Sequence, residues 1–200
     1  MPLSISNLAI VIYTRIDQIF LGKFLGYQAV GIYNAAMVIS QGWAIVPMAL
    51  ITSYMTLIAA ERDNRQGSEK IRSLYLIILV MSLPVILLLA IFSNKIIELV
   101  YVARFIDAAG ILWICALTSL CSVLRTLSYR VILLHSGCHF VSIKMPVIAL
   151  LNVSLNYFFI PRYGIKGAVL STLTTKIVSL VCLNALFKRK LVASPLFCAY

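Results

Sequence analysis

Long apolar segments dominate this chain, and short connections rich in Lys and Arg separate each segment from the next. A helix that crosses a membrane needs roughly 20 consecutive, mainly apolar residues. The chain is 62% apolar and 12% charged, whereas a typical soluble domain is about 25% charged. A soluble fold of 200 residues has too much surface relative to its volume to bury so many apolar side chains. We therefore predict an all-α, polytopic transmembrane helix bundle.

Six segments are predicted to span the membrane, and together they form a single domain over residues 1–187. The six spans are 3–22, 34–60, 73–92, 109–129, 145–160 and 165–187, and residues 188–200 form a cytoplasmic tail. None of them shows the alternating pattern of an outer-membrane β-strand. Pro47 and Pro84 lie inside two of the spans and are expected to kink them, which neighbouring helices in a bundle tolerate.

The basic residues indicate how the chain is oriented. With the amino terminus inside, the internal connections and the tail carry more Lys and Arg than the external connections do. Because cytoplasmic connections are enriched in these residues, we expect both termini in the cytoplasm. A formal net charge of +11 is also typical of nucleic-acid binding, but here the charges lie between apolar segments and not on one solvated face. We therefore expect membrane lipid, and not nucleic acid, as a partner.

Polar residues recur at steps of three and four inside several spans, so each set lies on one face of its helix. Gln18 belongs to such a face in the first span, while Asn152 and Asn156 lie one turn apart in the fifth. Small and hydroxylated side chains also allow helices to pack closely and to form hydrogen bonds. These faces are therefore expected to turn inward, either as packing surfaces or as the lining of a wet cavity.

Charged residues inside the spans give the strongest functional signal, because each costs roughly 2.5–3.5 kcal/mol at a span centre. Lys176 is about eleven residues from either end of its span, too deep for its side chain to reach the membrane surface. Arg125 is nearer an edge, which its side chain is able to reach. We predict an interior cavity that binds an anionic head group such as a diphosphate, since guanidinium groups pair well with phosphate oxygens. Its predicted substrate-binding residues are Arg15, Arg125, Lys176, Gln18, Asn152 and Asn156.

Asp17 is the single acid predicted inside this cavity. It is two residues from Arg15, so the two side chains point to different sides of the helix and the partner of Asp17 is expected on another helix. Pairing with Lys176 or Arg125, released on protonation, would couple transport to an ion gradient. The alternative is a fixed ion pair that only determines how the helices pack.

The sequence gives little support for catalysis. His135 and His139 are four residues apart with no Glu between them, so the zinc-protease pattern is missing, and the five cysteines lack metal-ligand spacing. We therefore predict a protein that is not an enzyme, with no catalytic residue, metal ligand or cofactor. An integral-membrane glycosyl- or acyltransferase would need a catalytic His or acid pair at a membrane face. A multidrug or small-solute antiporter for organic cations would need several buried acids, and only Asp17 is available.

Two stretches of sequence resemble a known family. The first comprises residues 13–22 (YTRIDQIFLG) and 31–36 (GIYNAA), and the second comprises residues 160–168 (IPRYGIKGA). They are similar to the opening of the second half, and to the connection before the final helix, of bacterial Wzx-type polysaccharide flippases. These flippases, which include O-antigen exporters, belong to the MOP superfamily that also contains the MATE-type antiporters. The two stretches bracket nearly the whole chain in the expected order.

This resemblance implies a function beyond what the residues alone predict. Such flippases have two lobes around a cationic vestibule, and they move undecaprenyl-diphosphate-linked oligosaccharide across the bacterial inner membrane by alternating access. Arg15 and Asp17 would face that vestibule from the first helix of the second lobe. The chain has one lobe, so we expect a partial exporter for O-antigen or capsule-type polysaccharide. It would be a truncated or split product, or would pair with an N-terminal lobe or a second chain.

Overall fold

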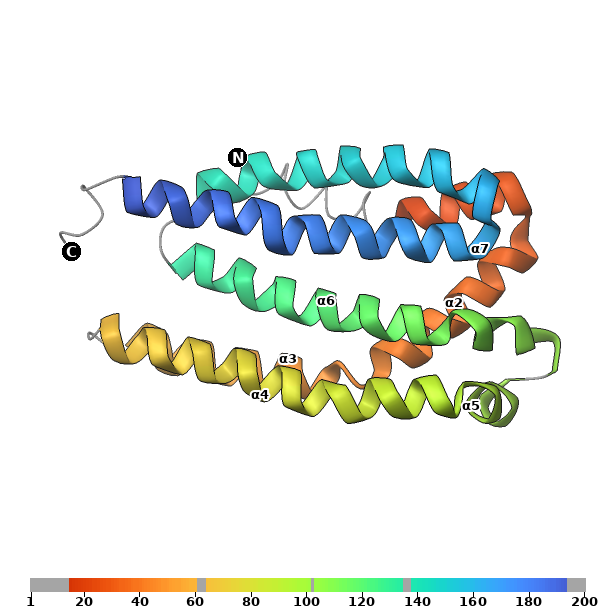
Figure 1. The fold of residues 1–200 in the computed structure, drawn as a ribbon, viewed down its shortest axis with the longest axis horizontal. Coiled ribbons are helices and arrows are strands. Elements are labelled where there is room, and N and C mark those ends of the chain that lie inside the picture. Colours follow the sequence, from red (N-terminus) through yellow and green to blue (C-terminus); the bar gives the residue numbers. More distant parts are fainter. Residues whose placement is uncertain (1–14, 61–63, 102, 135–137, 194–200) are drawn as a thin grey trace.

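The computed structural model describes residues 15–60, 64–101, 103–134 and 138–193, and the described chain is built from helices (Figure 1). The predicted all-α membrane bundle is confirmed. A first helical segment covers residues 15–25 and ends at Gly26, whose φ is 83°. The elements that follow are α2 (Tyr27–Gly42), α3 (Ile45–Ala60), α4 (Asn64–Ile91), α5 (Ser93–Val100), the 3₁₀-helix η1 (Ala103–Ala108), α6 (Ala109–Leu134) and α7 (Cys138–Ala193).

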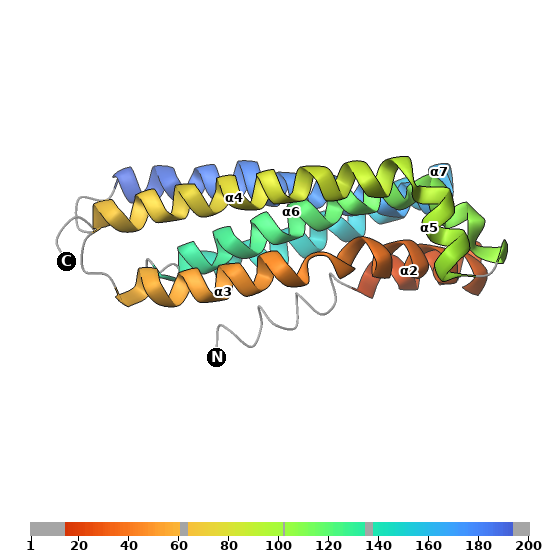
Figure 2. The same ribbon diagram turned by 90° about the horizontal axis from the view of Figure 1, so that it is seen from below.

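The long helices run along the long axis of an elongated bundle. Figure 1 shows α6 lying between α4 and α7, and Figure 2 shows α2 and α3 running one after the other beside α6. One buried apolar cluster, which includes Leu21, Ile32 and Val169, joins the first segment to α2, α6 and α7. A second cluster, which includes Leu74 and Leu127, joins α3, α4 and α6. Helix α6 contributes to both clusters and packs against α2, α3, α4 and α7, so it is the central helix of the bundle.

Helix α7 folds back on itself at Gly164, and its two legs run antiparallel in Figure 1. Gly164 has φ 60° and ψ −137°, a conformation that residues with a Cβ atom rarely adopt. Three residues later, a Cβ atom on Gly167 would clash with the backbone carbonyl of Phe159. The two glycines of residues 160–168 are therefore required by the tight return between the legs.

Several described helices are suited to a membrane. Three are long and apolar enough to cross it, Lys70–Ile91, Phe105–Leu133 and Ile143–Val181, and the described chain offers a fourth if α2 and α3 count as one bent span. The last of the three contains the turn at Gly164 and so comprises both legs of α7.

The bend between α2 and α3 amounts to 48° and falls at Trp43 and Ala44, whereas the sequence analysis expected a kink at Pro47. Pro47 lies in the first turn of α3, where a missing backbone N–H breaks no hydrogen bond of the helix. Pro84 lies within α4, which runs on through it as one helix.

Candidate functional site

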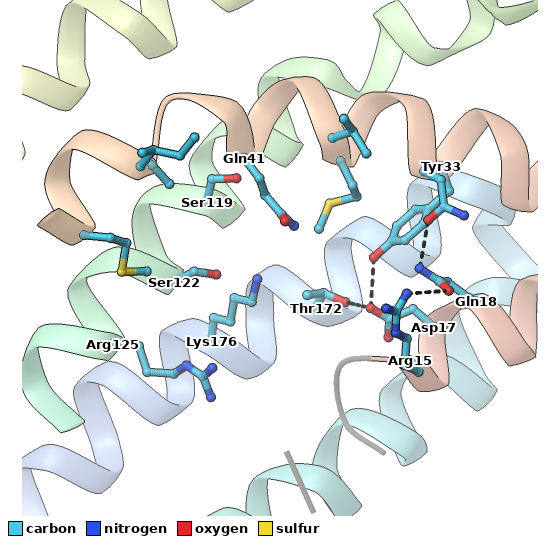
Figure 3. A pocket seen from close by; sticks show the side chains of 16 residues that line it. Arg15, Asp17, Gln18, Tyr33, Gln41, Ser119, Ser122, Arg125, Thr172 and Lys176 are labelled. Atoms are coloured by element: carbon cyan, nitrogen blue, oxygen red, sulfur yellow. Dashed lines mark hydrogen bonds between the residues drawn. The ribbon is translucent and has the colours of Figure 1, made fainter. Parts of the chain in front are cut away.

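A cavity of about 730 Å³ lies among the first helical segment, α2, the start of α3, α6 and the second leg of α7 (Figure 3). The segments that form it are far apart in the sequence and are brought together by the packing around α6. Five residues predicted to bind substrate or couple ions line it: Arg15, Asp17, Gln18, Arg125 and Lys176. The cavity therefore has three basic lining residues and one acid.

Asn152 and Asn156, the other two predicted substrate-binding residues, do not line this cavity. Both are completely buried on the first leg of α7, behind the wall that Asp17 and Thr172 form. Their side chains are nevertheless connected to the cavity, because Asn156 Nδ2 donates a hydrogen bond of 2.6 Å to Asp17 Oδ1.

Asp17 lies at one end of the cavity and is only 3% exposed. Its carboxylate accepts hydrogen bonds from Tyr33 on α2 at 2.9 Å, from Asn156 at 2.6 Å and from Thr172 on the second leg of α7 at 2.5 Å. The sequence predicts Lys176 or Arg125 as its partner, whereas these three donors are neutral. Hydrogen bonds to a charged group are stronger than those between neutral groups, so this carboxylate ties α2 and both legs of α7 to the first segment.

The polar network continues behind Asp17, away from the cavity. Asn156 Nδ2 also donates to Asn152 Oδ1 at 3.1 Å, and Ser171 Oγ donates to Asn156 Oδ1 at 2.5 Å. Asn152 Nδ2 donates in turn to Thr175 Oγ1 at 3.5 Å. These bonds join the two legs of α7, so buried polar groups that would be costly in an apolar environment satisfy one another.

Lys176 and Arg125 lie at the other end of the cavity, separated in Figure 3 from Asp17 by Thr172. Lys176 is 7% exposed, and its Nζ atom donates to the backbone carbonyl of Thr118 on α6 at 3.5 Å. The hydroxyl-bearing Ser119 and Ser122 of α6 line the wall beside this end. Two basic side chains and two hydroxyl groups thus surround the same end, an arrangement that suits an anion.

Arg15 lies on the exposed side of the first helical segment, near Asp17. Its Nη1 atom donates to Gln18 Oε1 at 3.4 Å, and Gln18 Nε2 donates to Asn34 Oδ1 on α2 at 2.8 Å. This chain of bonds positions the Arg15 guanidinium at the cavity wall. The three predicted basic residues therefore share one cavity, with Arg15 at the end opposite Lys176 and Arg125.

Sequence reasoning missed three polar residues of α2 that line the cavity: Tyr33, Asn34 and Gln41. All three lie in a mainly apolar stretch. Tyr33 and Asn34 each lie about two helical turns before Gln41, so the three residues lie on the same side of α2. This spacing could have identified a polar face on α2, but Tyr33 lies outside the predicted span 34–60. Thr172 lay in a polar stripe that was predicted to turn inward.

Among the described residues, no group of three His, Cys, Asp or Glu side chains is placed to hold a metal ion.

The remaining cavity wall is apolar, formed by Met37 and Val38 on α2 and by Ala44, Ile45 and Met48 at the bend and on α3.

An apolar helix bundle with basic side chains around an interior cavity defines the class of this molecule as a multi-pass membrane protein. The model of a family described as "Polysaccharide biosynthesis protein" matches residues 1–110, more than half of the chain. The chain belongs to this family, and the resemblance to flippase-type proteins of polysaccharide biosynthesis is confirmed. No curated protein and no solved structure matches the chain. The family match includes Arg15 and Asp17 and ends before Arg125 and Lys176.

Proposed function

We propose that this chain is one lobe of a flippase that moves a lipid-linked oligosaccharide across the bacterial inner membrane by alternating access. The product would be a surface polysaccharide of the O-antigen or capsule type, and the ligand would be an undecaprenyl-diphosphate-linked oligosaccharide. Family membership supports a role in polysaccharide biosynthesis. Alternating access would need a second lobe, contributed by another chain or by further sequence. The proposed orientation places both termini in the cytoplasm.

The observation that carries this proposal is the placement of Arg15, Arg125 and Lys176 around one cavity. Burying a basic side chain such as Lys176 in a membrane bundle is costly, and the cost is offset when an anionic group pairs with it. The cavity volume of about 730 Å³ falls within the roughly 300–1,000 Å³ of pockets that enclose drug-sized ligands. That volume suits a diphosphate with the first sugars attached, whereas a whole polyprenyl chain would have to remain in the bilayer.

The alternative functions fit the cavity less well. An antiporter for organic cations would need acids facing its ligand, and the only acid among the described residues that line this cavity, Asp17, is occupied by three hydrogen-bond donors. A membrane glycosyl- or acyltransferase would need a catalytic His or an acid pair, and the described residues that line this cavity include neither. We therefore propose transport and not catalysis.

Removing the basic groups tests the proposal directly. Arg15→Ala and Lys176→Ala, introduced singly in cells that depend on this chain, are expected to abolish most surface polysaccharide while the chain stays at its normal level in the membrane. Each loses a group that pairs with the diphosphate, and one such charge-assisted bond contributes roughly 1.5–3 kcal/mol. The matched control is Lys95→Ala, because Lys95 is exposed on α5 outside the cavity. Normal polysaccharide in both cavity variants would exclude this role.

We also propose that Asp17 couples transport to a proton or sodium gradient. Asp17→Asn removes the charge and keeps the shape, so uptake into vesicles is expected to lose most of its dependence on the gradient. Thr172→Ser is the control, because it preserves the hydroxyl that contacts Asp17. If gradient dependence is unchanged in Asp17→Asn while thermal stability falls, Asp17 only holds the helices together.

A further inference from the structure

Exposed basic residues gather at the turn where α7 folds back on itself. Lys23 lies near the end of the first helical segment, and Arg162 and Lys166 lie on either side of Gly164. All three side chains are exposed, and the two segments adjoin at this turn because the side chain of Leu25 lies beside Gly164. Figure 1 shows the turn at the end of the bundle opposite the start of α4. We define the basic patch as Lys23, Arg162 and Lys166.

The elements that form this end of the bundle carry no acid to neutralise the basic patch. The first segment beyond Asp17, α2 and α7 contain no Asp or Glu. Glu98 and Asp107 lie on α5 and η1, which pack mainly against each other and against α2, α4 and α6. The patch therefore has a net positive charge, and an anionic partner would complement it.

Aromatic rings lie directly beside the basic patch. The ring centroid of Tyr157, on the first leg of α7, lies 6.5 Å from that of Phe24 and 5.6 Å from that of Phe158. Phe24 follows Lys23 in the sequence, and Phe158 lies one helical turn before Arg162. We define the aromatic row as Phe24, Tyr157 and Phe158, all of which are exposed. The row places an open apolar surface next to the three positive charges.

This combination matches the surface layer of a bilayer. Tyr rings are enriched at the level of the lipid head groups, and Lys and Arg side chains extend their charges toward the phosphates. Neither the basic patch nor the aromatic row lines the cavity, so both are open to surrounding lipid. In the proposed orientation this end is external, where connections normally carry fewer basic residues than on the cytoplasmic side. Three exposed basic residues at such an end favour a specific anionic partner.

We propose that the basic patch and the aromatic row form a binding site for an anionic phospholipid on the outside of the bundle. The three basic side chains bind the head-group phosphate, and the aromatic row packs against the beginning of the acyl chains. A zwitterionic phospholipid is disfavoured because its own cation lies near the same positive charges. This site is separate from the cavity, so its occupancy does not depend on the proposed function. A second protein chain is the competing occupant.

The test is native mass spectrometry of the full chain in detergent, with dioleoyl phosphatidylglycerol and dioleoyl phosphatidylcholine as the two probes. The triple variant Lys23→Gln/Arg162→Gln/Lys166→Gln replaces exposed side chains, so folding should be preserved. It is expected to weaken phosphatidylglycerol binding at least about tenfold and to leave phosphatidylcholine binding unchanged.

Two further variants separate this site from a general effect of charge. Arg72→Gln/Lys95→Gln/Arg130→Gln removes the same number of exposed charges from α4, α5 and α6, and it should bind phosphatidylglycerol as the unaltered chain does. Lys23→Arg/Arg162→Lys/Lys166→Arg keeps the charges of the patch and should retain binding.

Four results would overturn the proposed lipid site. They are unchanged phosphatidylglycerol binding in the first triple variant, an equal loss in the matched control, an equal loss for phosphatidylcholine, and a comparable loss in the charge-conserving variant. Dissociation of a second chain from the first triple variant, seen as a smaller mass, would assign the surface to a protein partner instead.

Discussion

Helix α4 and the second leg of α7 (residues 165–193) are both long helices of the bundle, and they differ in how many polar residues their buried faces carry. On α4 the exposed face is apolar, with Val80, Leu83 and Leu87 each more than 60% exposed, and the mid-helix Ser82 is completely buried. On the second leg of α7 the buried face carries several polar residues, including Ser171, Thr175 and Lys176. The comparison shows that the polar residues named here lie on buried helix faces, while the exposed face of α4 is apolar.

The largest effect is expected from a charge on the outer face of α4. Val80 lies at the centre of the apolar stretch Lys70–Ile91, so Val80→Arg should cost roughly 2.5–3.5 kcal/mol of insertion free energy. The measurement is the inserted fraction of α4 in a glycosylation reporter fusion, with Val80→Leu as the control. Equal insertion of both variants would mean that this face does not contact lipid, and the contrast with α7 would be lost.

A smaller loss is expected from the polar network on the inner side. Asn156→Leu removes a donor to Asp17 and the bond that Ser171 makes between the two legs of α7, so the free energy of unfolding should fall by roughly 1.5–3 kcal/mol. The midpoint of thermal unfolding in detergent measures this loss. Tyr157→Leu is the neighbouring control, because Tyr157 is 59% exposed. A similar midpoint for the two variants would show that the network adds no stability.

The smallest effect is expected from a polar residue on the outer face of α7. Ser154 is exposed and bonds only to its own helix, at the carbonyl of Leu150, so Ser154→Ala should change stability by less than about 0.5 kcal/mol. Ser171→Ala, which removes a buried bond between the legs, should cost about 1 kcal/mol in the same assay. A larger loss for Ser154→Ala would reverse the comparison of outer and inner positions.

The fold class and the basic residues of the cavity were predictable because both follow from the cost of placing groups in lipid. Composition alone determines that the helices are membrane helices. Lys176 was identified because a charge deep in a span must face an interior, whereas Arg15 lines the cavity from the exposed side of the first helical segment. None of this depends on knowing which helices are neighbours.

The partners of Asp17 were not predictable from the sequence. Asn156 and Thr172 are 139 and 155 residues away along the chain, and only the packing of α7 against the first segment brings them to the carboxylate. Opposite charge was the natural expectation for a buried acid, but several neutral donors also satisfy a carboxylate. The bend at Trp43 was missed for a local reason, since Pro47 is accommodated without strain in a first helical turn.

The length of α4 has a consequence for the choice of lipid. Its apolar stretch of 22 residues is roughly 33 Å long, slightly more than the about 30 Å of bilayer hydrocarbon. A tilt of roughly 25° removes this difference and is close to the average of about 20° for such helices. In bilayers of shorter acyl chains the helix must incline further or thicken the lipid around it. Hydrophobic thickness should therefore be held constant whenever variants are compared after reconstitution.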